Sequence, residues 1–347
     1  YNYFGLAKQN MALFKKLKFG PYELANRIAM APMTRGRATE ANVPTEFMKL
    51  YYAQRASAGM IITEGTGITR QGIPWYCAPG IYNSAQINEW KIITDAVHNE
   101  GGIIGLQLWH LGRSGHPDIT GLPRLVSASP KPMKGEVPTK PTWKQMLSGD
   151  FTPVMKAYET PYPLLNKDGK NGTDNYVDDG YKYTIEEVVN DYAVAAENAV
   201  HKAGFDFVEI HGANGYIIDQ FIQTVTNERN DEYGGSIDNR LRFMREVVQK
   251  VCGVVDKRLV GIRLSPNGVF GQMGSKDNNE TFTEAITWLT LQNIGYIHLM
   301  DGLGFGFHDL SKPFTIEMGR EIIDKNTTDK ANPTLLIGNV GYTQELA

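Results

Sequence analysis

The chain has 347 residues, 41% of them hydrophobic, and its 35 basic and 38 acidic residues give a formal net charge of −3. This composition is typical of a globular protein with a sizeable core, and it offers no long-range attraction to nucleic acid or to an anionic membrane surface. The two cysteines are too few for a disulfide framework or a Cys-ligated iron–sulfur cluster, so we expect a reducing, cytoplasmic location and no metal site.

The first residues do not resemble a targeting signal. Residues 1–10 mix aromatic, polar and basic side chains without the apolar segment of a secretion signal, and no run of 18 apolar residues occurs in the sequence. Met11 begins a stretch that is typical of a natural start. We therefore interpret residues 1–10 as a non-native or disordered extension and residues 11–347 as a single domain.

Short apolar runs alternate along the chain with longer segments of helical period. The runs are bounded by Gly, Pro or polar residues, a pattern that predicts repeated βα units and a parallel sheet. Strands are predicted at 27–32, 60–64, 103–109, 205–211, 259–264, 296–300 and 335–338. Helices are predicted between them, at 45–58, 84–99, 184–203, 238–252, 281–293 and 315–326.

Three hydroxyl residues mark predicted helix starts. Ser84, Thr184 and Thr281 each stand at the beginning of a helical pattern, where a hydroxyl oxygen can cap backbone N–H groups. Thr184 also has Glu187 three residues later, as in a capping box. We expect helices to begin at these three positions.

Residues 112–183 interrupt the alternation of strands and helices. The stretch is rich in Pro, Lys, Gly and Asn, shows little periodicity and is much longer than an ordinary loop. In an α/β barrel the loops that follow the strands form the active-site face. We therefore expect this long excursion to lie over the mouth of a barrel.

The hexapeptide His211-Gly-Ala-Asn214-Gly-Tyr216 directly follows the fourth predicted strand. Polar side chains at the carboxyl ends of barrel strands point into the catalytic mouth. His211 and Asn214 can both donate hydrogen bonds to one oxygen that gains negative charge, and Tyr216 offers a phenolic proton. Alternatively, His211 and Tyr216 only satisfy each other in a turn, and the hexapeptide alone does not decide between these interpretations.

Several long segments, in the same order along the chain, resemble the Old Yellow Enzyme family of FMN-dependent ene-reductases. These segments are 26–35, 55–66, 107–113, the hexapeptide with 219–221, 227–240 and 261–266. Together they extend over most of the chain, so they are far more specific than any single motif. The resemblance implies a (β/α)8 TIM barrel that binds FMN non-covalently and is reduced by NADPH or NADH.

The resemblance also implies a set of cofactor-binding residues. They are Pro32, Met33, Thr34, Gly65, Gln107, Arg263, Gly338 and Asn339. Thr34 is expected to hydrogen-bond the flavin near N5, Gln107 its pyrimidine edge, and Arg263 to stabilise the reduced, anionic flavin. A side chain at Gly65 would intrude on the flavin ring. Gly338 and Asn339 correspond to part of a phosphate site.

On the substrate side, the resemblance implies that His211, Asn214, Trp109 and Tyr76 bind the substrate and that Tyr216 is the catalytic acid. The implied reaction is a ping-pong hydride transfer in which NAD(P)H reduces the flavin, and the C=C bond of an α,β-unsaturated carbonyl or nitro compound is then reduced. The physiological substrate is left open. The expected oligomeric state is a monomer or a homodimer.

The sequence also leaves two alternative functions open. A phosphate-binding barrel aldolase or isomerase would share the fold, but it needs a lysine or a general-base carboxylate at a strand end. Glu64 and Asp301 are the acidic candidates there, and the predicted strand ends offer no such lysine. The second alternative is a non-catalytic flavin-binding protein. His298 is interpreted as structural.

The resemblance also bears on the end of the chain. Members of the family are expected to continue after the seventh strand with a helix, an eighth strand and a final helix, whereas this sequence stops at Ala347. The resemblance thus predicts a barrel without its eighth strand and last helix. Such a barrel would expose sheet edges and lack part of the phosphate site, so we expect this chain alone to be unstable and to bind FMN poorly.

Overall fold

The computed structural model describes residues 12–73, 75–148, 150, 152–173, 182–302 and 306–342. At its centre lies a parallel sheet in which hydrogen-bonded neighbours follow the order β14, β13, β12, β11, β6, β4 and β3, with β5 added beside β6. These strands are β3 (Ala29–Met30), β4 (Met60–Ile62), β5 (Thr66–Gly67), β6 (Ile104–Trp109), β11 (Phe207–His211), β12 (Val260–Leu264), β13 (Tyr296–Met300) and β14 (Leu335–Asn339). The predicted strands are confirmed, with slightly different boundaries.

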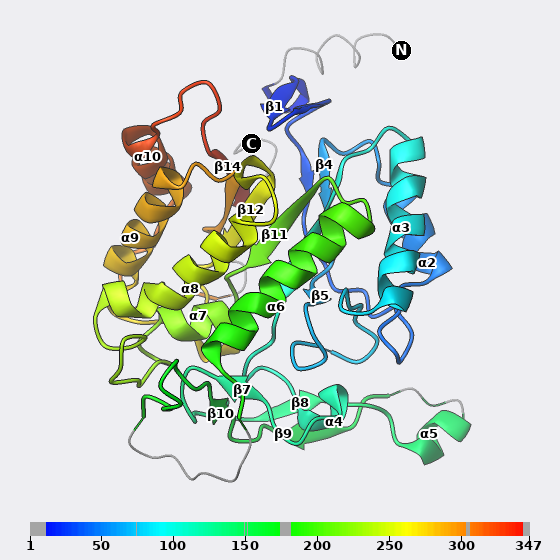
Figure 1. Ribbon diagram of the computed structural model, residues 1–347, viewed down its shortest axis with the longest axis vertical. Coiled ribbons are helices and arrows are strands. Elements are labelled where there is room, and N and C mark those ends of the chain that lie inside the picture. Colours follow the sequence, from blue (N-terminus) through cyan, green and yellow to red (C-terminus); the bar gives the residue numbers. More distant parts are fainter. Residues whose placement is uncertain are drawn as a thin grey trace.

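The sheet curves into a nearly closed barrel, and the longer helices pack around its outside (Figure 1). They are α2 (Glu46–Ala53), α3 (Ser84–Asn99), α6 (Ile185–Glu197), α8 (Ile237–Cys252), α9 (Asn278–Leu291) and α10 (Ile316–Asn326). Among the described residues β3 and β14 are not paired with each other, so an unsealed seam separates them. No helix in the described ranges has both the length and the apolar character needed to cross a bilayer.

Local capping explains where the helices begin. Thr184 and Glu187 form the predicted capping box: the Thr184 hydroxyl accepts from the Glu187 N–H at 3.1 Å, and the Glu187 carboxylate accepts from the Thr184 N–H at 2.7 Å. The cap of α3 is Asn83, which forms a capping box with Gln86, and Ser84 is the first helical residue. The prediction for Thr281 is wrong, because α9 already begins at Asn278, one turn earlier.

A short antiparallel hairpin, absent from the predicted elements, closes the amino-terminal end of the barrel. It consists of β1 (Leu17–Phe19) and β2 (Tyr22–Leu24). The buried Phe19 ring packs edge to face on Phe207 at 5.4 Å and on Tyr296 at 5.9 Å between ring centroids. Aromatic pairs of this kind add about 0.5–1.5 kcal/mol each beyond the area that they bury. The hairpin thus plugs the end of the barrel opposite the carboxyl ends of the strands.

The long excursion contains short elements of its own and gathers at the opposite end of the barrel from this hairpin (Figure 1). Its elements are α4 (Pro117–Thr120), β7 (Val126–Ser127), β8 (Glu136–Pro138), α5 (Trp143–Leu147), β9 (Met155–Ala157) and β10 (Tyr162–Pro163). β7 pairs with β10 and β8 pairs with β9. The described part of the excursion therefore lies at the carboxyl ends of the barrel strands.

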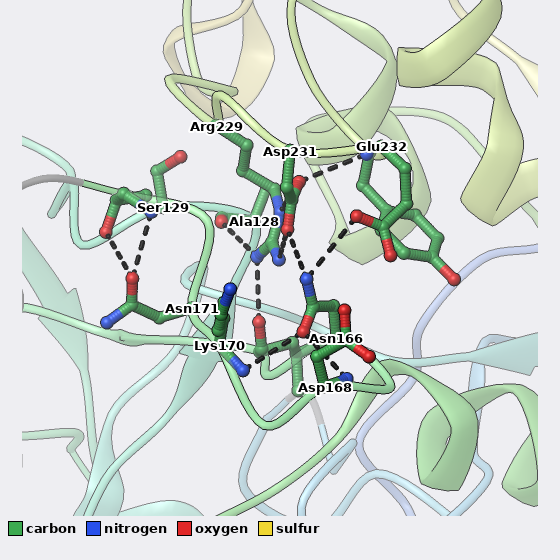
Figure 2. A network of polar contacts seen from close by, with 12 residues as sticks. Ala128, Ser129, Asn166, Asp168, Lys170, Asn171, Arg229, Asp231 and Glu232 are labelled. Carbon is green, nitrogen blue, oxygen red and sulfur yellow. Dashed lines mark hydrogen bonds and ion pairs between the residues drawn. The ribbon is translucent and has the colours of Figure 1, made fainter.

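A buried arginine ties the excursion to the loop between β11 and α8. Figure 2 shows the Arg229 guanidinium between the Asp231 carboxylate and backbone carbonyls of the excursion. Nε and Nη2 of Arg229 bind the two Asp231 oxygens at 2.9 and 2.6 Å, and Nη1 donates to the carbonyls of Ala128 at 3.1 Å and Leu164 at 2.7 Å. Asn166 also donates to Asp231 at 3.2 Å. Because a buried cation needs partners for its donors, these bonds fix the excursion over the mouth.

The register of the strands brings polar residues together inside the barrel. Glu209 of β11 lies beside Gln107 of β6, while His211 lies beside Arg263 of β12. Arg263 in turn lies beside His298 of β13. Since alternate residues of a strand point to the same face, Glu209 and His211 share the inner face of the barrel. The residue between them in the sequence points to the opposite face of the sheet and packs in the apolar core toward the helices.

Candidate active site

A cavity of about 240 Å³ lies at the carboxyl ends of β3, β6, β11, β12 and β13. Its lining residues are Pro32, Thr34, Trp75, Gln107, Trp109, His211, Asn214, Tyr216, Arg263, Phe270 and Met300. Most of the predicted site residues therefore meet in one place, although they come from segments far apart in the sequence. A larger cavity, about 520 Å³, follows the seam between β3 and β14, but its lining is mainly apolar, and the hexapeptide lies outside it.

His211 is a neutral hydrogen-bond donor at the wall of the cavity. The Ala213 N–H donates to His211 Nδ1 at 3.3 Å, so the neutral ring carries its proton on Nε2. Burial, with additional repulsion from the Arg263 cation, holds the pKa of His211 well below its ordinary value of 6.5. The Trp109 indole stacks on the imidazole at 5.5 Å between centroids with an interplanar angle of 29°. His211 is thus held rigidly in its neutral form.

A tight turn directly after β11 places Asn214 at the cavity. Asn214 and Gly215 have φ values of 58° and 70°, in the left-handed region that glycine and asparagine adopt most readily. The Asn214 N–H donates to Ser265 Oγ at 2.8 Å, and the Gly215 N–H donates to Asp219 Oδ2 at 2.9 Å. The turn is therefore anchored on both sides, and the amide of Asn214 remains at the cavity surface.

Tyr216 begins the short helix α7 (Ile217–Ile222) and faces the same cavity. Its side chain is 4% exposed, and its ring lies edge to face on His211 at 4.8 Å and on Trp109 at 4.6 Å between centroids. Burial raises the pKa of Tyr216 far above its ordinary value of 10. The hydroxyl is therefore protonated at neutral pH and can donate a proton or a hydrogen bond.

The floor of the cavity is a buried network of charged and polar side chains. Gln107 Nε2 donates to Glu209 Oε1 at 2.7 Å, and His298 Nδ1 lies 2.8 Å from Glu209 Oε2. Arg263 Nη2 donates to Asn339 Oδ1 at 2.7 Å, whereas the buried Arg263 Nε has no partner among the described residues. Burial lowers the pKa of Arg263 from its ordinary value and Glu209 counteracts this effect, so the guanidinium remains charged at neutral pH.

The other predicted residues lie outside this cavity. Met33 is 45% exposed, and the Tyr76 hydroxyl donates to Glu40 at 2.5 Å. Among the described residues of the loop that carries Tyr76, Trp75 lines the cavity instead. Gly338 and Asn339 line the cavity at the seam. Gly65 lies against Trp109: a Cβ atom there would be 2.0 Å from Cε3 of the indole.

Sequence reasoning missed several residues of the site. Trp75, Phe270 and Met300 line the cavity, and Glu209 and His298 lie beneath it. The sequence does contain a pattern that indicates Glu209. A carboxylate two residues before His211 in a buried strand must share the inner face of the barrel with it. The loops that carry Trp75 and Phe270 contain no comparable pattern.

Residues 12–303 match the model of a family described as NADH:flavin oxidoreductase / NADH oxidase family. The chain is 38% identical over 340 residues to chanoclavine-I aldehyde reductase fgaOx3 of Penicillium roqueforti, covering 96% of this chain and 80% of that protein. It is also 38% identical over 291 residues to a probable flavin mononucleotide-dependent alkene reductase of Leishmania infantum, covering 84% of this chain and 73% of that protein.

Solved structures agree with these matches. The old yellow enzyme homologue from Zymomonas mobilis superposes with a TM-score of 0.79 at 36% identity, covering 97% of this chain and 84% of that structure. Similar fungal proteins also include some that are named probable inactive dehydrogenases or reductases. Similarity alone therefore does not establish activity, and the side chains at the cavity carry the functional argument.

Proposed function

Because the chain belongs to the NADH:flavin oxidoreductase / NADH oxidase family, the Old Yellow Enzyme family, we propose that it reduces the C=C bond of α,β-unsaturated carbonyl or nitro compounds with FMN and NAD(P)H. The observation that carries the proposal is the convergence of His211, Asn214 and Tyr216 on one cavity. Two neutral donors and one phenolic acid are the groups that such a reduction requires.

The side chains around the cavity fit FMN. Arg263 supplies a buried cation whose Nε has no partner in the part of the chain that the structure describes, and Gln107, whose Nε2 binds Glu209, keeps Oε1 as its remaining polar atom. The half-buried Thr34 adds a hydroxyl at the cavity wall. A flavin ring carries carbonyl acceptors and an N–H donor on one edge, which suits this set of groups. Bound FMN would supply hydride storage between NAD(P)H and the unsaturated compound.

The roles of the protein groups follow from their protonation states. His211 Nε2–H and the Asn214 amide would donate to the carbonyl or nitro oxygen of the substrate, and thereby stabilise the negative charge that develops there. Tyr216 holds a proton at its hydroxyl and would deliver it to the α-carbon. The rings of Trp75, Trp109 and Phe270 make the remaining walls apolar, which excludes water from the reacting atoms.

The aldolase or isomerase alternative finds no support at the cavity. Glu64 accepts from the Tyr52 hydroxyl at 3.1 Å and from the Arg35 N–H at 3.0 Å, and Asp301 accepts from the Tyr342 hydroxyl at 3.0 Å. In the part of the chain that the structure describes, neither carboxylate lines the cavity, and no lysine does. The groups that such chemistry requires are therefore engaged elsewhere.

The proposal is tested by titrating the purified protein with FMN and following the visible absorbance of the bound flavin. We expect non-covalent binding, loss of the oxidised flavin spectrum on adding NADPH or NADH, and its return on adding an enone. A protein that remains colourless with excess FMN would refute the cofactor assignment. A protein that binds FMN, is reduced by NAD(P)H and is not reoxidised by any enone, enal or nitroalkene would be a flavin-binding protein without ene-reductase activity.

A further inference from the structure

Glu209 lies beneath the cavity, at the centre of its polar floor, and its side chain is fully buried. One carboxylate oxygen accepts from Gln107 Nε2 at 2.7 Å, and the other lies 2.8 Å from His298 Nδ1. Both partners are themselves buried; Gln107 comes from β6, which pairs with β11, and His298 comes from β13, which is separated from β11 by β12. The mechanism proposed above assigns no role to this carboxylate.

The surroundings of Glu209 favour its ionised form. Burial alone would raise the pKa of the carboxyl, but His298, Arg263 and the Gln107 amide outweigh burial and hold the pKa below its ordinary value. Burial lowers the pKa of His298, so its ring is neutral at neutral pH, with its proton directed to the carboxylate. The buried anion that remains is electrostatically coupled to Arg263, the cation of the cavity.

We propose that Glu209 is a positioning residue for the flavin site, which orients the Gln107 amide and offsets part of the positive charge of Arg263. The inference rests on the proposed function, since it presumes that FMN binds in the cavity. The Glu209 side chain would therefore have two separable effects. The hydrogen bond determines which end of the Gln107 amide meets the cofactor, and the charge sets the electrostatic potential at the cofactor.

The orientation effect follows from the hydrogen-bonding capacity of the groups. A carboxylate can only accept, so Gln107 must turn its NH₂ group toward Glu209 and its Oε1 away from it. Without an acceptor at position 209 the amide is free to reverse. Oε1 accepts a hydrogen bond and NH₂ donates one, so reversal would convert a site for the flavin N3–H group into one that repels it.

The charge effect concerns the reduced flavin, which is an anion. A positive charge close to the ring stabilises the reduced form, and a buried negative charge close to that cation weakens the stabilisation. Glu209 is therefore expected to keep the flavin midpoint potential lower than Arg263 alone would set it. Removing only the charge should raise the potential.

Two substitutions separate these effects. Glu209→Gln removes the charge but keeps an acceptor for Gln107, and its NH₂ group can donate to His298 Nδ1 once the neutral imidazole carries its proton on Nε2. Glu209→Leu removes both the charge and the acceptor. Glu246→Gln is the matched control, because Glu246 is a half-buried carboxylate on α8 that accepts from the Tyr233 hydroxyl at 3.1 Å, outside the barrel. For each protein we would measure the midpoint potential of bound flavin and the dissociation constants of FMN and N3-methyl-FMN.

We expect Glu209→Gln to raise the equilibrium constant for two-electron reduction about tenfold, or about 30 mV, with FMN still bound. The native protein and Glu246→Gln should bind FMN at least about tenfold more tightly than N3-methyl-FMN, and in Glu209→Leu this preference should disappear. If Glu209→Leu does not fold, the midpoint potential of Glu209→Gln still decides the electrostatic role.

An unchanged potential in Glu209→Gln would overturn the electrostatic role, and a preserved preference in folded Glu209→Leu would overturn the orienting role. Native protein that binds neither flavin would instead refute the proposed function, so the two failures are distinguishable.

Discussion

The indole of Trp109 occupies the space that a side chain at residue 65 would need, since a Cβ atom added to Gly65 would lie 2.0 Å from Trp109 Cε3. Trp109 in turn stacks on His211. The absence of a side chain at Gly65 therefore permits the packing that holds the imidazole in place. The sequence predicted that a side chain here would intrude on the cofactor, and the structure adds that it would first displace Trp109.

Gly65→Ala should therefore shift Trp109 and disturb His211. We expect a loss of about 1–3 kcal/mol in the free energy of unfolding, as is usual for overpacking. We also expect weaker binding of phenols, whose oxygen would mimic the substrate carbonyl oxygen at His211 and Asn214. Urea unfolding and a phenol titration would measure both. Gly268→Ala is the control, because the atom nearest to an added Cβ there is Ser265 Cβ at 4.0 Å. Equal stability of the two variants would contradict the packing argument.

Tyr216→Phe should leave flavin reduction by NAD(P)H nearly unchanged and slow the reduction of enones about a hundredfold or more, because only the second half-reaction uses the phenolic proton. Stopped-flow measurement of each half-reaction would test this. In the control Tyr233→Phe, the lost hydroxyl binds Glu246 on α8, and both half-reactions should keep their rates. Equal slowing of both halves in Tyr216→Phe would show that Tyr216 has another role.

The neutral state of His211 predicts the pH dependence of phenol binding. Because the pKa of His211 is held well below 6.5, affinity for a phenol of high pKa should show no change as the pH passes through that value. His211→Ala or Asn214→Ala should weaken binding by about 1 kcal/mol or more, whereas His201→Ala, on the outer helical turn η2 (Asn198–Lys202), should not. A step in affinity near pH 6.5 that disappears in His211→Ala would show that the histidine is charged in the free protein.

Asp219 should make the protein less stable as the pH rises toward neutrality. Burial raises its pKa from 3.8 to about 7, although Gly215 and Gln223 donate hydrogen bonds to it. Between these two values the unfolded chain ionises this group and the folded chain does not. Its stabilising contribution is therefore complete below the unfolded pKa and is lost as the pH rises through the folded pKa.

Relative to Asp219→Asn, the native free energy of unfolding should fall by about 2 kcal/mol from pH 5 to pH 7. Urea unfolding at several pH values would measure this difference. Asp238→Asn is the control: the bond to Arg245 lowers the pKa of this exposed carboxyl, so its contribution is lost only under more acidic conditions. A difference between native protein and Asp219→Asn that does not vary with pH would refute the prediction.

Local patterns in the sequence were sufficient for much of the fold. The alternation of apolar runs and helical segments located the barrel strands, because each run carries its own burial and turn signals. His211 was assigned to the mouth because parallel strands end on the same side of a barrel, whereas Arg263 was assigned through the resemblance to the family. The helix start predicted at Thr281 was wrong because a single hydroxyl residue cannot locate a helix end by itself. A hydroxyl one turn inside α9 gives the same local pattern as a hydroxyl that caps the helix.

Only the tertiary structure decided what lies around and beneath that mouth. Gln107 and Glu209 are 102 residues apart in the sequence, and Glu209 and His298 are 89 apart, so no local pattern pairs them. The packing of Trp109 on Gly65 and the closure of the barrel end by Phe19 likewise depend on the register of neighbouring strands. Periodicity records which face of a segment is buried, but the partner that covers that face is set by close packing among distant segments.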